Sequence, residues 1–104
     1  MDLTGQTTVG HCAAIIENAD VYLGMDSGLT HLANALHKPV VALFGPIDAK
    51  LRVVGQETCT VLSGNEFAQC QPCNDNRRDG CGGRPRCLEA IPIEAVVEAV
   101  GRWV

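Results

Sequence analysis

The chain has 104 residues and a formal net charge of -4 at pH 7. This length suits one small domain, and 46% hydrophobic residues are enough for a modest core. The acidic balance argues against a general nucleic-acid binder, and no apolar run reaches the roughly 20 residues of a transmembrane helix. The first residues, MDLTGQTT, lack the basic and apolar regions of a signal peptide, so we expect a cytoplasmic protein.

The beginning of the chain predicts a strand end followed by a helix. Asp2-Leu3-Thr4 is typical of the last residues of a strand. Thr7 or Thr8 can cap a helix that runs to about Asn18. Apolar residues recur in this helix at the spacing of one buried stripe: Val9, Cys12, Ala13 and Ile16.

The stretch from Val21 to Pro46 predicts a βαβ unit. Val21 to Gly24 is a short apolar run with the length of a buried strand, and Asp26-Ser27-Gly28 interrupts it. A helix follows, with an apolar face formed by Leu29, Leu32, Ala33 and Leu36. Lys38-Pro39 ends this helix, and Val40 to Phe44 is a second buried strand. The two strands should be parallel and joined by a right-handed crossover.

The remaining elements complete an α/β pattern. Thr58 to Leu62 alternates and is rich in β-formers, so it predicts a third strand, whereas Ser63 to Arg86 is rich in turn residues. Pro92 opens a last helix with a favourable Glu98–Arg102 pair. Its apolar residues are Ile93, Val96, Val97, Val100 and Val104. We predict a partial Rossmann-like parallel sheet of three or four strands with three helices, in one domain over residues 1–104.

A candidate binding site lies where the first strand of the βαβ unit meets the helix. The first amides of a helix have no intrahelical acceptor, and the macrodipole places partial positive charge there. Gly28 has no side chain that would hold a ligand away. The amides of Gly28, Leu29 and Thr30 can therefore converge on an anion, typically a phosphate. The alternative interpretation is that Asp26 or Ser27 simply caps the helix.

The three histidines have different expected roles. His31 is in the first turn of the same helix, close enough to contact a bound diphosphate. His37 is near the end of that helix, where an imidazolium suits the dipole, so a structural role is favoured. His11 is expected on the exposed side of the first helix, without a role. No arrangement of residues predicts nucleophilic catalysis.

Four cysteines, Cys70, Cys73, Cys81 and Cys87, form a second candidate site in a cysteine-rich loop at residues 63–90. Two cysteines two residues apart are a half-site for tetrahedral zinc, and the other two can complete it. The second pair is loosely spaced, so iron–sulfur ligation, two disulfides or free thiols also fit. A structural zinc is the first interpretation. Four arginines of this loop can meet a phosphate, although a solvated loop is simpler: Arg77, Arg78, Arg84 and Arg86.

The run MDSGLTHLANALHKPVVALFGPID resembles the donor-side signature of glycosyltransferase family 9, the ADP-heptose:lipopolysaccharide heptosyltransferases. In that family an Asp-Ser/Thr-Gly-x-x-His-x-Ala segment enters a helix, and a strand ending in Gly-Pro follows. The matching positions here are Asp26-Ser27-Gly28, His31, Ala33 and Gly45-Pro46. The resemblance implies part of the C-terminal domain of a two-domain GT-B enzyme. This chain then corresponds to the later part of the donor-binding domain, as a fragment or as a truncated relative.

The resemblance also implies a function. The chain would be the donor-binding part of an inverting glycosyltransferase of bacterial lipopolysaccharide core synthesis, with ADP-heptose as the expected donor. Asp26 would bind sugar hydroxyls, while Ser27 and Gly28 would hold the β-phosphate of the leaving group. The full substrate-binding set is Asp26, Ser27, Gly28, Leu29, Thr30, His31, Gly45 and Pro46. Ile47 stands where the family usually has a small hydroxyl residue, so a polar contact there is in question.

The family comparison places the general base in the other domain, so we expect no catalytic residue in this chain and no cofactor required for transfer. The acceptor, a lipopolysaccharide core, would be held by that missing domain. By the same comparison the chain also lacks the first strands of the donor domain. Their absence would leave an open sheet edge that favours a homo-oligomer. The expected location is the cytoplasm or the periphery of the inner membrane. The competing hypothesis is a small four-cysteine metal-binding or redox module on a Rossmann-like scaffold, so whether this chain is an enzyme stays open.

Overall fold

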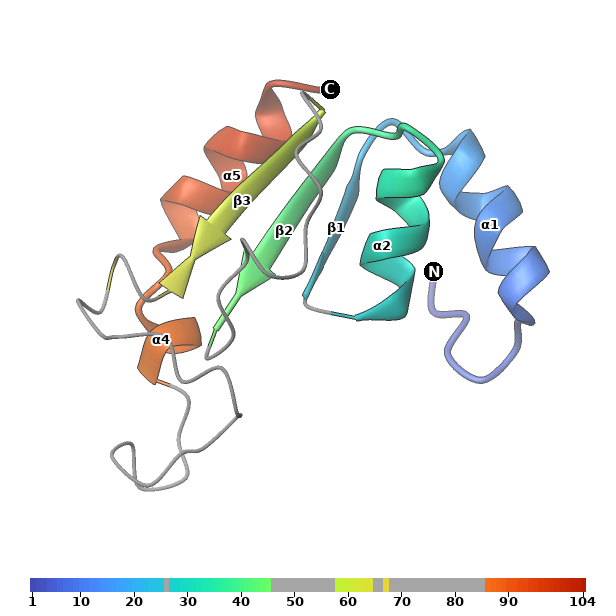
Figure 1. Ribbon diagram of the computed structural model, residues 1–104, viewed down its shortest axis with the longest axis horizontal. Helices are drawn as coiled ribbons and strands as arrows, with labels where there is room; N and C mark the ends of the chain where they lie inside the picture. The colour runs from blue at the N-terminus through green and yellow to red at the C-terminus, as the bar shows by residue number, and fades with distance from the viewer. Residues whose placement is uncertain (26, 46–57, 65–66, 68–85) are drawn as a thin grey trace.

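The computed structural model describes residues 1–25, 27–45, 58–64, 67 and 86–104. Helices and strands alternate along most of these residues (Figure 1). In chain order they are α1 (Val9–Asn18), β1 (Tyr22–Met25), α2 (Gly28–Ala35), β2 (Val40–Phe44), β3 (Cys59–Ser63), α4 (Arg86–Glu89) and α5 (Ile93–Gly101). No helix in the described ranges is both long enough and apolar enough to cross a membrane.

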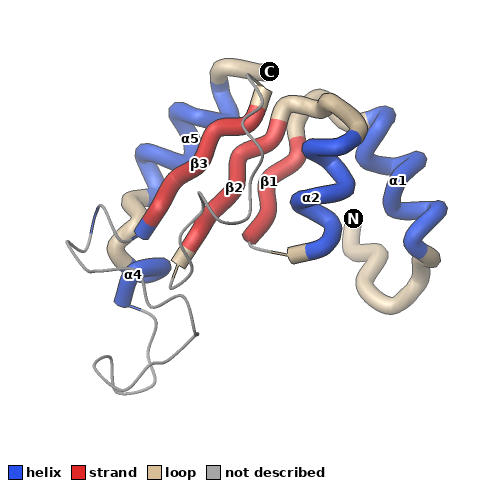
Figure 2. The backbone as a smooth tube through the Cα atoms, in the orientation of Figure 1, coloured by secondary structure: helices blue, strands red, loops and turns tan. Residues whose placement is uncertain are grey.

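The three described strands form one parallel sheet in the order β1-β2-β3 (Figure 2). Tyr22 pairs with Val40, and Val40 pairs in turn with Cys59. β2 has the predicted bounds, while β1 and β3 begin and end one residue later than predicted. The predicted α/β class, with a partial Rossmann-like parallel sheet, is therefore confirmed.

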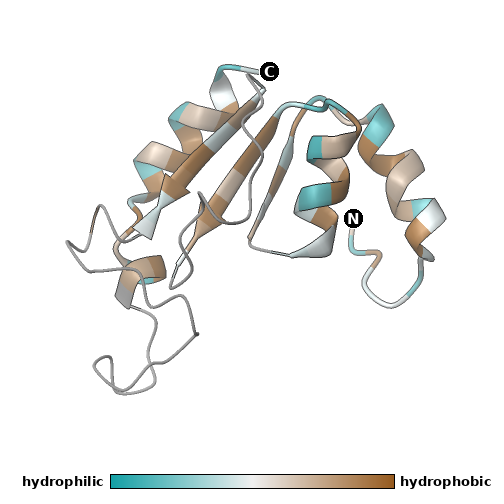
Figure 3. Ribbon diagram, viewed as in Figure 1, coloured by the Kyte–Doolittle hydropathy of each residue, from teal (hydrophilic) through white to brown (hydrophobic). Residues whose placement is uncertain are grey.

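The core is centred on β2, the middle strand. Val40, Val41, Ala42 and Phe44 are each 0% exposed, as expected for a parallel strand that is covered on both faces. Figure 3 shows the continuous hydrophobic colouring of this strand. One cluster joins β2 to α1 and α2 through Ile16, Ala33, Val40, Ala42 and Phe44. α5 packs against β2 and β3 (Figure 1).

Thr8 caps α1, as predicted. Its hydroxyl accepts a hydrogen bond from the His11 amide at 3.2 Å, and the His11 Nδ1 accepts one from the Thr8 amide at 3.3 Å. His11 thus takes the position that Glu or Gln occupies in a capping box, and the prediction that it has no role is wrong. Ile16 is buried in the predicted stripe. Val9 is 73% exposed and lies outside it, because the first turn has no covering element in the described part of the chain.

The prediction of a strand end at Asp2-Leu3-Thr4 is wrong. The Asp2 carboxylate accepts hydrogen bonds from the Thr4 amide at 2.9 Å and from the Thr4 hydroxyl at 2.6 Å. These bonds, first the one to the hydroxyl, lower the pKa of Asp2. A turn follows in which Gly5 has a φ of 74°. A short carboxylate side chain that binds its own backbone competes with strand pairing, which explains the difference.

α2 ends in a Schellman motif. The His37 amide donates to the Asn34 carbonyl at 3.0 Å, and the Lys38 amide donates to the Ala33 carbonyl at 3.1 Å. His37 has a φ of 58°, a left-handed conformation that glycine usually provides. His37 therefore has a backbone role in ending the helix, in agreement with the structural interpretation.

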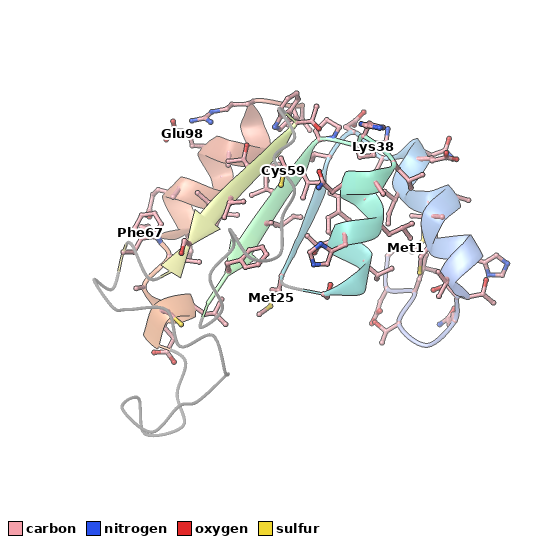
Figure 4. All side chains as sticks on the ribbon, viewed as in Figure 1. Met1, Met25, Lys38, Cys59, Phe67 and Glu98 are labelled. Atoms are coloured by element: carbon pink, nitrogen blue, oxygen red, sulfur yellow. The ribbon has the colours of Figure 1, made fainter. Side chains whose placement is uncertain are left out.

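α5 begins after Pro92, as predicted, and carries the expected Glu98–Arg102 pair at 3.3 Å. Both side chains are exposed, and Figure 4 shows Glu98 on the outer side of α5, so the pair adds little stability. Three of the apolar residues assigned to this helix are more than half exposed: Ile93, Val97 and Val104. Ala99, at 2% exposed, takes the central packing position instead.

Candidate functional site

The candidate anion site lies at the carboxyl edge of the sheet, where β1 is followed by α2. Ser27 precedes α2 in an extended conformation, with φ -153° and ψ 168°, and its side chain makes no capping hydrogen bond. The His31 amide makes the first bond of the helix, to the Ser27 carbonyl at 3.4 Å. The amides of Gly28 and the next two residues precede this bond, so helix geometry gives them no intrahelical acceptor.

The exposure of these residues suits a ligand that approaches from solvent. Ser27, Gly28 and Leu29 are all exposed, with Leu29 at 39%. A side chain added at Gly28 would meet nothing within 4 Å, so the space over the first helical turn is open. His31 is half-buried in this turn. The first turn of α2 therefore offers an open, amide-rich surface with the positive end of the helix dipole.

Thr30 braces the connection between β1 and α2. Its side chain is 1% exposed, and its hydroxyl donates to the main-chain carbonyl of Met25, the last residue of β1. The same hydroxyl pairs with the Tyr22 hydroxyl at 3.4 Å. Sequence reasoning assigned only the backbone amide of Thr30 to the site. This hydrogen bond ties the first turn of α2, which carries the first helical amides, to the end of β1.

The Tyr22 ring reaches Thr30 because it lies over Gly24. A Cβ atom at Gly24 would lie 2.5 Å from both Cε1 and the hydroxyl oxygen of Tyr22. Residues i and i+2 of a strand share a face, so only glycine leaves room for a ring that folds along the strand. An aromatic residue two positions before a strand glycine is the sequence signal that could have indicated this arrangement.

We expect Thr30→Val to lower the free energy of unfolding by about 1–3 kcal/mol, because the nearly isosteric side chain leaves the Met25 carbonyl without its hydroxyl donor. Thr30→Ser keeps the hydroxyl and serves as the control. Urea denaturation followed by circular dichroism measures both variants. Equal losses in the two variants would mean that the methyl group, and not the hydroxyl, makes the important contact.

Of the other predicted site residues, some lie within the described structure and some lie outside it. Gly45 is buried directly after β2, at the same carboxyl edge of the sheet (Figure 1). Asp26 and Pro46 lie outside the described residues, and so do three of the four candidate metal ligands: Cys70, Cys73 and Cys81. The fourth, Cys87, is 6% exposed in α4, a short helix that the sequence did not predict. Within the described ranges, no three side chains of the metal-binding types are grouped to hold an ion.

An apolar cavity of about 460 Å³ lies beside the candidate anion site, between the N-terminal segment, α1, β1 and α2. Leu3, Ile15, Ile16, Tyr22 and Leu29 are among its lining residues. Sequence reasoning missed it because the lining comes from four separate segments. Few polar groups face the cavity, so it does not suit the anion itself.

Comparison with known proteins gives consistent matches. A family model described as glycosyltransferase family 9 (heptosyltransferase) matches residues 1–79. The chain is 37% identical over 62 residues to lipooligosaccharide heptosyltransferase 2 of Haemophilus influenzae, and 37% identical over 46 residues to lipopolysaccharide heptosyltransferase 3 of Escherichia coli. These matches cover 60% and 44% of this chain.

The same matches cover only 18% and 14% of the two heptosyltransferases. The chain therefore spans less than a fifth of the length of these relatives. No solved structure matches it significantly.

Proposed function

The chain belongs to glycosyltransferase family 9, and we propose that it is the part of such an enzyme that binds the diphosphate of a nucleotide-sugar donor. One observation carries the proposal: Ser27, Gly28 and Leu29 are exposed at the start of α2, and the Ser27 side chain does not cap the helix. Among the described residues, no side chain caps these first helical amides, which supports their binding an external anion. Because the whole chain carries a net charge of -4, binding of an anion requires a local positive site such as this helix start.

The proposed chemical role is stabilisation of the leaving group. In sugar transfer an acceptor hydroxyl attacks the anomeric carbon while the bond to the diphosphate breaks, and negative charge grows on the diphosphate. Fixed amide dipoles stabilise such charge without reorganising during the reaction. The Thr30 hydroxyl, bonded to the Met25 carbonyl, holds the helix start in place for this task.

The proposed donor is ADP-heptose, and the proposed acceptor is a lipopolysaccharide core. The names of both relatives, a lipopolysaccharide heptosyltransferase and a lipooligosaccharide heptosyltransferase, support these substrates. Asp26 is proposed to bind sugar hydroxyls, and His31 to contact the diphosphate. Acceptor binding and base catalysis are proposed for other parts of the whole enzyme. A cytoplasmic location of the protein and its assembly into a homo-oligomer stay predictions from the sequence.

Titration of the isotopically labelled chain with ADP, followed by amide NMR shifts, tests the proposal. We expect the amides of Ser27, Gly28, Leu29 and Thr30 to move most, and to move less with AMP, which has one phosphate fewer. Uniform shifts, or shifts confined to α4 and α5, would contradict the assignment of the site to the start of α2.

A further inference from the structure

α4 rests on two glycines that follow neighbouring strands. Gly64 directly follows β3, and a Cβ atom there would overlap the carbonyl oxygen and carbonyl carbon of Cys87. Gly45 directly follows β2, and a Cβ atom there would lie 2.8 Å from Leu88 Cγ and 3.2 Å from Cys87 Sγ. The backbone of α4 thus occupies space that any other residue at Gly64 would need. We call Gly45 and Gly64 the glycine seat.

The glycine seat lies at the same sheet edge as the start of α2 (Figure 1). Met25 of β1 pairs with Leu43 of β2, and two residues further along each segment come Ser27 and Gly45. Gly45 is therefore level with the start of α2 on one side and packed against α4 on the other. Cys87, whose Sγ and carbonyl group face the two glycines, is only 6% exposed.

We propose that α4 is a positioning element of the donor site proposed above, on which this inference rests. Gly45 and Gly64 are the positioning residues. The packing of α4 against Gly45 holds the Gly45 backbone at the level of the first amides of α2. A backbone segment that is already fixed loses less entropy when a ligand binds, so the site binds its donor more tightly. The tight fit at Gly64 keeps α4 in this position.

The first test separates positioning by α4 from direct ligand contact. Gly45→Ala places a methyl group against Leu88 Cγ, and we expect it to raise the dissociation constant for ADP by about fivefold or more, at the lower end of typical coupling between sites. Leu88→Ala removes the nearest obstructing atoms, Cγ and Cδ1, and leaves only the looser contact with Cys87 Sγ at 3.2 Å, so the double variant should recover most of the affinity. Gly101→Ala is the matched control, because a Cβ atom there meets nothing within 4 Å. No recovery in the double variant would mean that the methyl group blocks the ligand directly, which would overturn the proposal.

The second test uses Gly64→Ala, whose methyl group meets main-chain atoms that cannot rotate away. We expect the Ile91 amide, which donates to the Leu88 carbonyl of α4 at 3.2 Å, to exchange faster with solvent, β2 amides to stay protected, and ADP to bind more weakly. Loss of α4 protection with unchanged ADP affinity would refute the inference while leaving the donor site intact. If the unmodified chain does not bind ADP, the proposed function fails as well. If Gly64→Ala does not fold, the Gly45 and Leu88 variants decide.

Discussion

Replacing Phe44 with alanine is expected to lower the free energy of unfolding by about 3–5 kcal/mol, the usual cost of removing a buried aromatic side chain. Phe44 is the largest fully buried side chain in the described structure and is 0% exposed. Small domains have about 5–15 kcal/mol of stability in total. The variant should therefore lose a large share of its total stability. Phe44 also precedes Gly45, so the carboxyl edge of the sheet should lose its order together with the core.

Urea denaturation monitored by circular dichroism measures this loss, and Val97→Ala provides the control. Val97 is 63% exposed on α5, so its truncation should change stability by no more than about 0.5 kcal/mol. A Phe44→Ala variant that loses less than about 1 kcal/mol would show that the cluster around β2 can collapse into the vacated space.

The βαβ unit could be predicted because its signals are local. Pro39 and Gly45 enclose five apolar residues, and a run of this length without polar alternation is typical of a strand buried on both faces. β2 accordingly has the predicted bounds. The neighbouring strands are displaced by one residue, since their ends lack such clear boundaries.

Burial was harder to predict than secondary structure. Apolar spacing predicts that a helix has an apolar face, but the spacing does not say whether another element covers that face. Val9 belongs to the predicted buried stripe of α1, and Ile93 is one of the apolar residues of α5, yet both are more than 70% exposed in the described structure. On β1, Leu23 and Met25 are also about half exposed, and Figure 4 shows Met25 at the end of this strand. The burial of these residues therefore depended on whether another element packs over them.

Some features of the candidate site could likewise be found from the sequence, and others could not. Ser27 and Gly28 could be found from the sequence because helix starts have local signatures. The Thr30 hydroxyl bond reaches back five residues to a carbonyl of β1, outside the helix, so helix spacing alone does not indicate it. The contact between Gly64 and Cys87 joins residues far apart in the chain, and no local pattern indicates it. Glycine in a turn-rich stretch predicts a turn, whereas the structure uses Gly64 for close approach of another backbone.

Replacing Gly28 with valine is expected to abolish nucleotide binding while the chain stays folded. A Cβ atom at Gly28 meets nothing within 4 Å, and valine is a better helix former than glycine, so the fold should tolerate the change. The branched side chain would occupy the open space over the first helical amides. Hydrogen bonds to a charged group contribute about 1.5–3 kcal/mol each, so losing two of them weakens ADP binding by about a hundredfold or more.

Gly101→Val is the matched control, because it makes the same chemical change at another open helical glycine. Gly101 ends α5, at the opposite end of the sheet from the start of α2 (Figure 1). Calorimetric titration with ADP should show unchanged affinity for Gly101→Val and no measurable binding for Gly28→Val, with similar urea midpoints for both. Equal ADP affinity in the two variants would place the diphosphate away from the start of α2. A loss of binding confined to Gly28→Val requires a ligand that approaches the backbone of the first helical turn, because that approach is what the valine side chain prevents.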